Sequence, residues 1–256
     1  MNRITEAFGR RKALIPFVTG GDPDMDVTEK LIYTLADAGA DLIEIGVPFS
    51  DPIAEGPVIL AASDRSLRAG CTADKLFDLV RRVRRRTDIP LLFMTYLNPV
   101  FVYGSRRFME NCADAGIDGL IVPDMPWEER AELLDDCAAC GVTLVSMLAP
   151  TSAERVRRIA AEAAGFLYCV SSLGVTGERR EIDHTVAGIV ARAREVTDVP
   201  CAVGFGISTP AQAGEMAALA DGVIVGSAIV RLIAEHGADC LEPVGEFTRG
   251  LRAAID

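Results

Sequence analysis

The sequence predicts an α/β protein that folds as a (β/α)8 TIM barrel, with residues 1–256 forming a single domain. Three observations lead to this prediction. Short apolar runs recur eight times along the chain, longer amphipathic segments separate them, and the length is close to the ~250 residues typical of such a barrel. Each run is nearly continuously apolar, as expected for parallel strands that are buried on both faces.

The expected elements alternate regularly along the chain. The strands are Leu14–Val18, Leu42–Ile45, Leu91–Thr95, Gly119–Val122, Thr143–Leu148, Phe166–Val170, Pro200–Val203 and Gly222–Val225. The helices are Thr28–Ala38, Lys75–Val83, Arg106–Ala115, Trp127–Cys140, Ala153–Ala164, Val186–Val196, Ala211–Leu219 and Ile229–Glu235. A doubly wound sheet of eight strands is the alternative fold, but the glycine-rich fingerprint expected after its first strand is absent.

The second expected strand carries an acidic residue within its apolar run. Glu44 lies close to the end of this strand, and a buried carboxylate is costly unless it is paired or used. The following loop carries a second carboxylate, Glu55, and the Gly56-Pro57 pair suits the start of a helix, since proline is favoured at the first helical position. Because chemistry in a barrel takes place on the loops that follow the strands, both acids are expected at one mouth with Tyr96 and Thr176.

Composition argues against several other classes of protein. The net charge of −11 argues against a nucleic-acid-binding surface. No apolar run reaches the ~18 residues that a membrane helix needs, and the polar first residues are not expected to be a secretory signal. The seven cysteines, an odd number at scattered positions, suggest reduced thiols in a cytoplasmic protein. With only two histidines, no metal site is expected, and carboxylates are the leading acid–base candidates.

Three glycine-containing loops suggest a site for a phosphate group. They follow the sixth, seventh and eighth expected strands and contain Thr176-Gly177, Phe205-Gly206 and Gly226-Ser227. Glycine lets the backbone approach an anion closely, and barrels often bind phosphate through backbone N–H groups of the last two of these loops. Ser227 is also expected to cap the helix that follows. We therefore expect a phosphorylated ligand, the alternative being that these loops are purely structural turns.

With these motifs in place, the sequence resembles the tryptophan synthase α chain family over nearly its whole length. The most specific segment is residues 44–57, and it is supported by residues 16–23, 94–99, 122–126, 174–177 and 204–208 in the family's order. The resemblance implies a lyase that performs the retro-aldol cleavage of indole-3-glycerol phosphate to indole and glyceraldehyde 3-phosphate. It also implies an α2β2 complex in which a β chain carries pyridoxal phosphate and converts the indole to L-tryptophan. No cofactor is expected in this chain.

The resemblance also implies roles for individual residues. Glu44 matches the family's catalytic glutamate, Glu55 lies where most members have a catalytic aspartate, and Tyr168 matches a tyrosine beside the glycerol chain. Other residues match the family's substrate-binding positions. Those around the indole are Phe17, Met94 and Tyr96, and those on the phosphate loops are Thr176, Gly177, Phe205, Gly206, Gly226 and Ser227. The residues that match loop positions facing the β chain are Asp51, Asn98 and Pro99.

Both carboxylates suit the expected chemistry. Carbon 3 of the indole ring must gain a proton, a side-chain hydroxyl must lose one, and the ring nitrogen becomes positively charged. Glu44, buried at the strand end, is expected to have a raised pKa and to relay the protons, whereas Glu55 is expected to stay ionised and to stabilise the positive charge. Three positions depart from the family pattern: Glu55 is one methylene longer than aspartate, Leu60 replaces a glutamine, and Ser172 replaces an arginine.

Other functions remain open from the sequence. Glu55 and Leu60 are compatible with a non-catalytic α-like chain that activates a β chain without cleaving anything. A free-standing lyase that releases indole is a further possibility. Another phosphate-binding barrel, such as a sugar-phosphate epimerase, is disfavoured because no metal-ligating histidine lies at a strand end.

Overall fold

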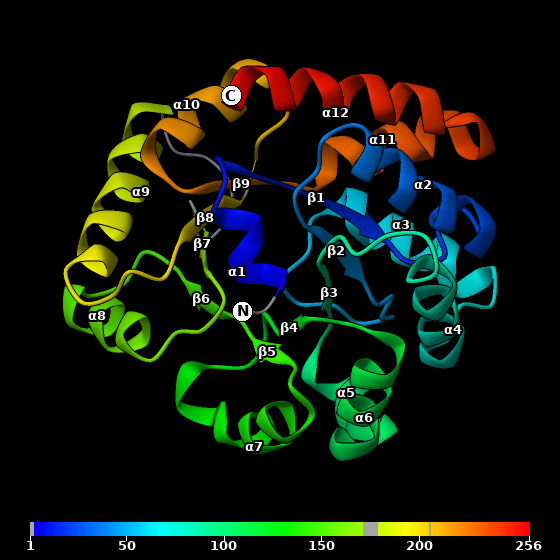
Figure 1. The fold of residues 1–256 in the computed structure, drawn as a ribbon, viewed down its shortest axis with the longest axis horizontal. Coiled ribbons are helices and arrows are strands. Elements are labelled where there is room, and N and C mark those ends of the chain that lie inside the picture. The colour runs from blue at the N-terminus through cyan, green and yellow to red at the C-terminus, as the bar shows by residue number, and fades with distance from the viewer. Residues whose placement is uncertain (1–2, 171–178, 205) are drawn as a thin grey trace.

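Parallel strands form a ring that is surrounded by helices (Figure 1), as the sequence predicts. The structure is a computed structural model that describes residues 3–170, 179–204 and 206–256. The strands are β1 Ala13–Thr19, β2 Ile43–Gly46, β3 Leu91–Met94, β4 Gly119–Ile121, β5 Thr143–Leu144, β6 Ser146–Leu148, β7 Leu167–Val170, β8 Cys201–Gly204 and β9 Gly222–Val225.

The prediction of one continuous fifth strand was wrong, because this segment is split into β5 and β6. The strands are ordered β5-β4-β3-β2-β1-β9-β8-β7-β6, and every pairing between them is parallel. Val145 lies between the two halves, and its N–H donates to the carbonyl of Leu120 at 2.9 Å. The segment from Thr143 to Leu148 thus has β4 on one side and β7 on the other, which brings the two ends of the sheet together into a barrel.

The helices agree with the expected segments and add several others. The expected ones are α2 Met25–Asp37, α3 Pro57–Arg68, α4 Ala73–Val83, α6 Ser105–Ala115, α7 Ala131–Cys140 with the 3-10 helix η1 Trp127–Glu129 before it, α8 Ala153–Ala161, α9 Arg179–Arg194, α10 Pro210–Leu219 and α11 Ser227–His236. The sequence did not predict α1 Arg3–Phe8, α5 Leu97–Tyr103, the 3-10 helix η2 Gly237–Asp239 or α12 Leu241–Ile255. Side chains fix several helix starts, since Asp24, Thr72, Ser152 and Thr209 each accept a bond from a first-turn N–H.

Alternation along each strand separates an outer from an inner face. In the second strand, Ile43 and Ile45 pack in the large cluster between the sheet and the helices. Leu42 instead belongs to a smaller cluster inside the barrel, together with residues such as Ile15 and Leu92. Glu44 is two residues from Leu42 and therefore faces the barrel interior as well.

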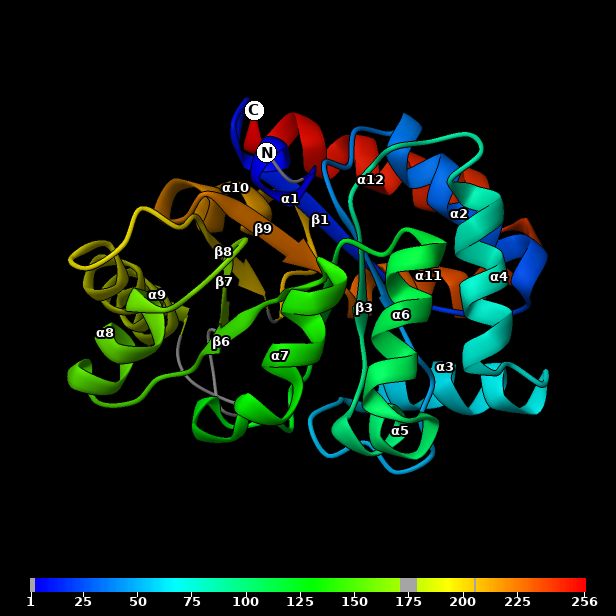
Figure 2. The same cartoon turned by 60° about the horizontal axis from the view of Figure 1, so that its bottom comes forward.

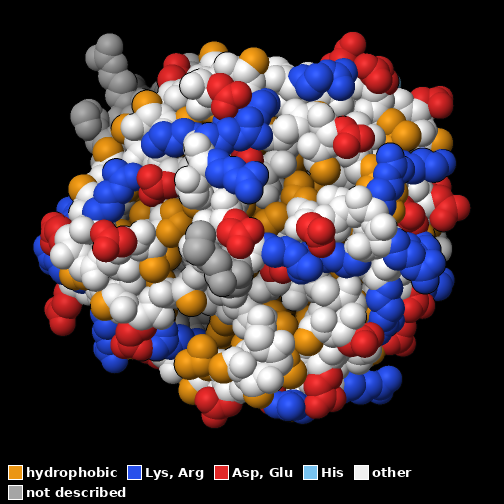
Figure 3. All heavy atoms as spheres, viewed as in Figure 1, with side chains coloured by type: hydrophobic (Ala, Val, Ile, Leu, Met, Phe, Trp, Pro, Cys, Tyr) orange, Lys and Arg blue, Asp and Glu red, His pale blue; other side chains and the backbone are white. Residues whose placement is uncertain are grey.

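The first helix closes one end of the barrel. Ile4 of α1 is fully buried in the inner cluster, and the ring of Phe8 lies 5.4 Å from that of Phe166. Figure 2 shows α1 at the same end of the molecule as both termini. Charged side chains of both signs cover much of this end, with hydrophobic side chains between them (Figure 3). The open mouth is therefore at the carboxyl ends of the strands, where barrel enzymes place their chemistry.

Among the helices that the structure describes, none has both the length and the apolar character needed to cross a membrane.

Candidate active site

The Glu44 side chain is completely buried near the end of β2. It lies in register with Phe17 of β1 on one side and with Leu92 of β3 on the other. Neither carboxyl oxygen has a hydrogen-bond partner. Burial therefore raises the pKa of Glu44 well above its usual value, so this carboxyl holds its proton more tightly than a solvated one.

Tyr168 of β7 shares the barrel interior with Glu44. Its ring packs against the inner cluster, and burial raises the pKa of its hydroxyl, with a further contribution from the charge of Glu44. A Cβ at Gly204, on the neighbouring strand β8, would lie 2.7 Å from the Tyr168 hydroxyl oxygen. Glycine at this position therefore makes room for the tyrosine, a packing reason that the sequence does not reveal.

Phe17 and Met94 belong to an apolar cluster on the two strands that flank the strand of Glu44. Both pack in one small cluster with Ala62 of α3 and Val230 of α11. A Cβ at Gly46 would lie 2.5 Å from the Cζ atom of Phe17, so this glycine allows the aromatic ring to take its place. An apolar surface of this kind suits contact with a planar aromatic group.

Tyr96 contacts the acidic loop that follows β2. Its side chain is 2% exposed, and its ring lies 5.5 Å from that of Phe49. Its hydroxyl oxygen accepts the N–H of Ala54 at 3.1 Å, which holds the loop before α3 against the mouth. Asp124 fixes the segment that follows Tyr96, since its Oδ1 accepts the N–H of Leu97 at 2.9 Å.

Glu55 lies on this loop with its carboxyl beside Tyr96, and one oxygen, Oε2, is buried without a partner. Burial raises the pKa of Glu55 to about 7, although its hydrogen bond with Tyr96 acts in the opposite direction. The expectation that Glu55 stays ionised therefore holds only in part, because both protonation states are populated near neutral pH. The cause is that burial at the mouth removes much of the carboxyl from solvent.

Unpaired buried polar atoms gather at the mouth. Within the described ranges, the buried side-chain atoms without a hydrogen-bond partner are Thr19 Oγ1, both oxygens of Glu44, Glu55 Oε2, Trp127 Nε1 and Arg252 Nε. The first three of these residues lie at the carboxyl ends of β1 and β2 or on the loop after β2. Sequence reasoning missed Thr19, which two-residue alternation from Phe17 could have placed on the inner face. Because folded proteins pair nearly all buried polar atoms, this cluster is suited to receive polar groups of a ligand.

The glycine loops after β8 and β9 also lie at the mouth. Gly206 has a φ of +72° and open space where a Cβ would stand. Gly226 is the N-cap of α11, without a side-chain bond to the first turn, so the prediction that Ser227 caps this helix was wrong. Ser227 is instead the first helical residue. The first-turn N–H groups therefore stay available for an anion, which also gains from the helix dipole. Thr176, Gly177 and Phe205 lie outside the described residues.

The residues expected to face a β chain lie on one exposed rim. Asp51 is exposed on the loop after β2, and Asn98 and Pro99 begin α5. A groove of about 580 Å³ between these two segments is lined by Pro48, Phe49, Ser50, Leu67, Asp74, Asn98, Pro99, Val102, Tyr103 and Arg107. Exposed apolar side chains stand nearby on the same two segments, namely Ile53 at 79%, Phe101 at 72% and Val102 at 77% exposure.

Comparisons with known proteins agree with this geometry. A family model described as "Tryptophan synthase alpha chain" matches residues 5–253. The tryptophan synthase alpha chain of Lacticaseibacillus casei is 44% identical over 256 residues, covering 100% of this chain and 96% of that protein. The crystal structure of tryptophan synthase subunit alpha from Legionella pneumophila superposes with a TM-score of 0.91 at 37% identity, covering 100% and 99%. A chain of the tryptophan synthase α2β2 complex of Pyrococcus furiosus superposes with a TM-score of 0.87 at 36% identity, covering 95% and 98%.

Proposed function

We propose that Glu44 and Glu55 perform the cleavage of indole-3-glycerol phosphate in this chain, which belongs to the tryptophan synthase alpha chain family of lyases. The observation that carries this proposal is the pair of carboxyls, each with at least one buried unpaired oxygen, in a mouth that also holds the apolar cluster of Phe17 and Met94. We place the planar indole ring against this apolar cluster, which leaves the unpaired oxygens for its polar atoms.

Glu44 is the proton-transfer group. Burial raises its pKa, so it holds a proton more tightly than a solvated carboxyl; it protonates carbon 3 of the indole ring and accepts a proton from the side-chain hydroxyl. Tyr168, buried beside it, orients the glycerol chain of the substrate. The bond between the ring and the glycerol chain then breaks, giving indole and glyceraldehyde 3-phosphate.

Glu55 binds the ring N–H and stabilises the positive charge that develops on it. In its ionised form it is a preorganised negative group in a partly buried site, where such a charge acts more strongly than in water. The bond with Tyr96 favours this ionised form, because it lowers the pKa of Glu55. The phosphate group binds at the N-terminus of α11 and the loops that carry Gly177 and Gly206.

The retained carboxylate at position 55 supports catalysis over a purely activating role. Glu55 has the reach to contact Tyr96, so its extra methylene relative to aspartate is absorbed within the mouth. Leu60, the other departure, is on the second turn of α3 and 43% exposed.

The partner is a tryptophan synthase β chain. Alpha chains of this family pair with it, and the α2β2 complex of Pyrococcus furiosus is one such assembly. The family's pyridoxal phosphate is carried by the β chain, and this chain requires no cofactor of its own. The cytoplasm is the compartment that suits seven free thiols.

The test measures indole release from indole-3-glycerol phosphate by the purified chain, with and without a β chain. We expect release in both cases, and a loss of about 10²–10⁴-fold for Glu44→Gln with little change in ligand affinity. A Glu44→Gln variant with half of the original turnover would refute the assignment. A parent chain that releases no indole, even with a β chain, would refute the enzymatic function.

A further inference from the structure

The helix layer opens at one place, beside the split fifth strand. α7 packs against α6, and α8 packs against α9, but α7 and α8 make little direct contact with each other. A cavity of about 340 Å³ lies between them, over β5 and β6. This volume lies within the usual range of small-molecule sites, and the cavity is separate from the residues proposed for catalysis.

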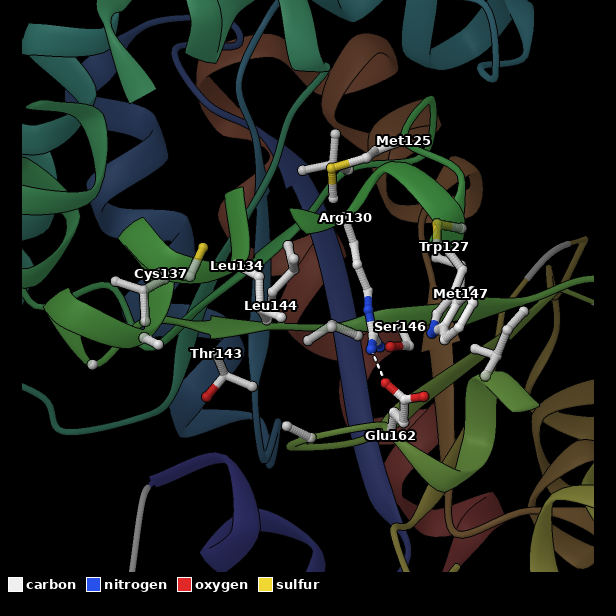
Figure 4. Close-up of a pocket in the computed structure, with 17 residues that line it drawn as sticks. Met125, Trp127, Arg130, Leu134, Cys137, Thr143, Leu144, Ser146, Met147 and Glu162 are labelled. Atoms are coloured by element: carbon white, nitrogen blue, oxygen red, sulfur yellow. Dashed lines mark hydrogen bonds and ion pairs between the residues drawn. The ribbon is translucent and has the colours of Figure 1, made fainter. Parts of the chain in front are cut away.

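The interior of the cavity is apolar. Its walls include Leu134 of α7, Leu144 and Met147 on either side of the strand break, and Ile159 of α8. Figure 4 shows Leu134, Leu144 and Met147 around the central space. Such a lining binds an apolar ring or chain by removing its surface from water.

The polar groups at the opening are mainly donors. Trp127 lines the cavity, and its Nε1 is buried without a hydrogen-bond partner. The guanidinium of Arg130 lies 4.5 Å from the centroid of the Trp127 ring, and that of Arg158 lies 4.4 Å from it. Arg130 pairs with Glu162, the residue that caps the C-terminus of α8 on the other side of the opening, and Figure 4 shows this contact across the cavity. Ser146 adds a hydroxyl.

We propose that this cavity binds a small molecule that has an apolar body and a carboxylate. The apolar body fills the space between α7 and α8. The carboxylate accepts the orphan N–H of Trp127 and competes with Glu162 for the Arg130 guanidinium, because charge-assisted bonds to a guanidinium are the strongest available there. A purely apolar occupant would leave the Trp127 N–H unpaired, which is unfavourable in a buried setting.

Trp127 also makes the site directly observable. It is the only tryptophan of the chain, so tryptophan fluorescence reports on this cavity alone. The probe is 3-phenylpropanoate, titrated into the full chain, and its uncharged counterpart is 3-phenylpropan-1-ol. We expect a saturable change of Trp127 emission with the acid, and about tenfold weaker binding of the alcohol, the difference of one charge-assisted hydrogen bond.

A matched pair of variants locates the ligand. Ala138 lines the cavity and Ala139 does not, although both are exposed on α7. Ala138→Leu fills the space and is expected to weaken binding of the acid by at least about tenfold, whereas Ala139→Leu leaves it within about twofold. Arg130→Gln is expected to abolish the preference for the acid over the alcohol. Calorimetry gives a second readout of affinity that does not depend on the tryptophan.

Three results would overturn the proposal. The first is an emission of Trp127 that does not saturate with 3-phenylpropanoate, and the second is equal binding by the Ala138→Leu and Ala139→Leu variants. The third is equal affinity for the acid and the alcohol in the unaltered chain. None of these results bears on indole release, so they leave the proposed lyase function unaffected.

Discussion

Burial raises the pKa of Glu55, and the Tyr96 hydroxyl lowers it. This oxygen accepts the N–H of Ala54, and its own hydrogen remains for the Glu55 carboxyl. A phenol that donates to a carboxylate stabilises the ionised form, which offsets part of the effect of burial. The pKa of about 7 for Glu55 is therefore the balance of two opposing effects at a single pair of side chains.

This balance predicts the pH dependence of cleavage. If the ionised form of Glu55 stabilises the transition state, kcat/KM falls as pH drops below about 7, where the carboxyl takes up its proton. Tyr96→Phe removes the bond that lowers the pKa, so the acidic limb should move to higher pH. The measurement is kcat/KM for indole-3-glycerol phosphate from about pH 6 to 9.

Glu55→Gln is the control for this assignment, because an amide cannot titrate and the limb attributed to Glu55 should disappear. A limb that stays in place in both variants would show that another group causes it.

The sequence predicted Glu44 well and Glu55 only in part. Glu44 stands out because it lies within an apolar run that forms a buried strand. Its own burial followed directly from that pattern. The pKa of Glu55 depends on its burial at the mouth and on its hydrogen bond with Tyr96, which is distant in sequence and comes close only in the folded barrel. Thr19 was missed because a threonine at a strand end looks ordinary until its hydroxyl is found without a partner.

At the scale of elements, α3 is fastened to the loop after β1. Arg65 of α3 donates two hydrogen bonds to Asp22, each 2.8 Å long, and Asp22 is only 1% exposed. The hydroxyl of Ser66 donates to the carbonyl of Gly20 at 2.6 Å. The loop after β1 therefore holds α3, the helix that follows the acidic loop, in position.

Arg65→Ala should destabilise the fold, because it leaves the buried Asp22 carboxylate without its charged partner. We expect a loss of about 2 kcal/mol in the free energy of unfolding, below the full cost for a deeply buried pair, since Arg65 is itself partly exposed. Arg68→Ala is the matched control on the same helix, where the pair with Asp64 is exposed and worth about 0.3–0.5 kcal/mol. Urea unfolding measures both, and equal losses would contradict a special role of Arg65.

Gly206 allows a similar test of the loop after β8. Gly206→Leu should raise the dissociation constant of glycerol 3-phosphate, because a side chain would stand where the anion is proposed to bind. Gly141→Leu is the control, since Gly141 has a φ of +69° against +72° for Gly206 and similarly open surroundings, but caps α7 away from the mouth. Calorimetric titration should show weaker binding for the first variant only. Weaker binding in both would indicate a general effect of backbone strain.

Most elements, but not all, could be predicted from their patterns. The apolar runs located the strands because both faces of a parallel strand are buried. The break at Val145 was not visible, since the segment from Thr143 to Leu148 is mostly apolar, whereas its hydrogen bonding passes from β4 to β7. The short helix α5 begins only three residues after the end of β3, so the sequence pattern places its residues in the loop after that strand. α12 was missed because the repeating unit already ended with α11.

For the whole molecule, the exposed apolar side chains of the mouth predict where the β chain docks. Phe101→Ser should weaken the increase in cleavage that a β chain produces. The substitution removes a large apolar side chain, 72% exposed in the free chain, that is expected to contact the β chain. Cleavage by the isolated chain should stay the same. Val196→Ser is the control, an exposed apolar residue outside this rim. Titration of the β chain against indole release measures the effect, and an identical response of both variants would place the interface elsewhere.

Helix α1 gives the barrel a floor, with Ile4 and Phe8 inserted beneath the inner cluster. The barrel is consequently closed at the end covered by α1, and its site opens at the opposite end. A cleavage that makes two products from one substrate must send both of them out past the rim by which the substrate came in. A β chain bound at that rim, as we propose, would therefore control both the entry of the substrate and the release of its products.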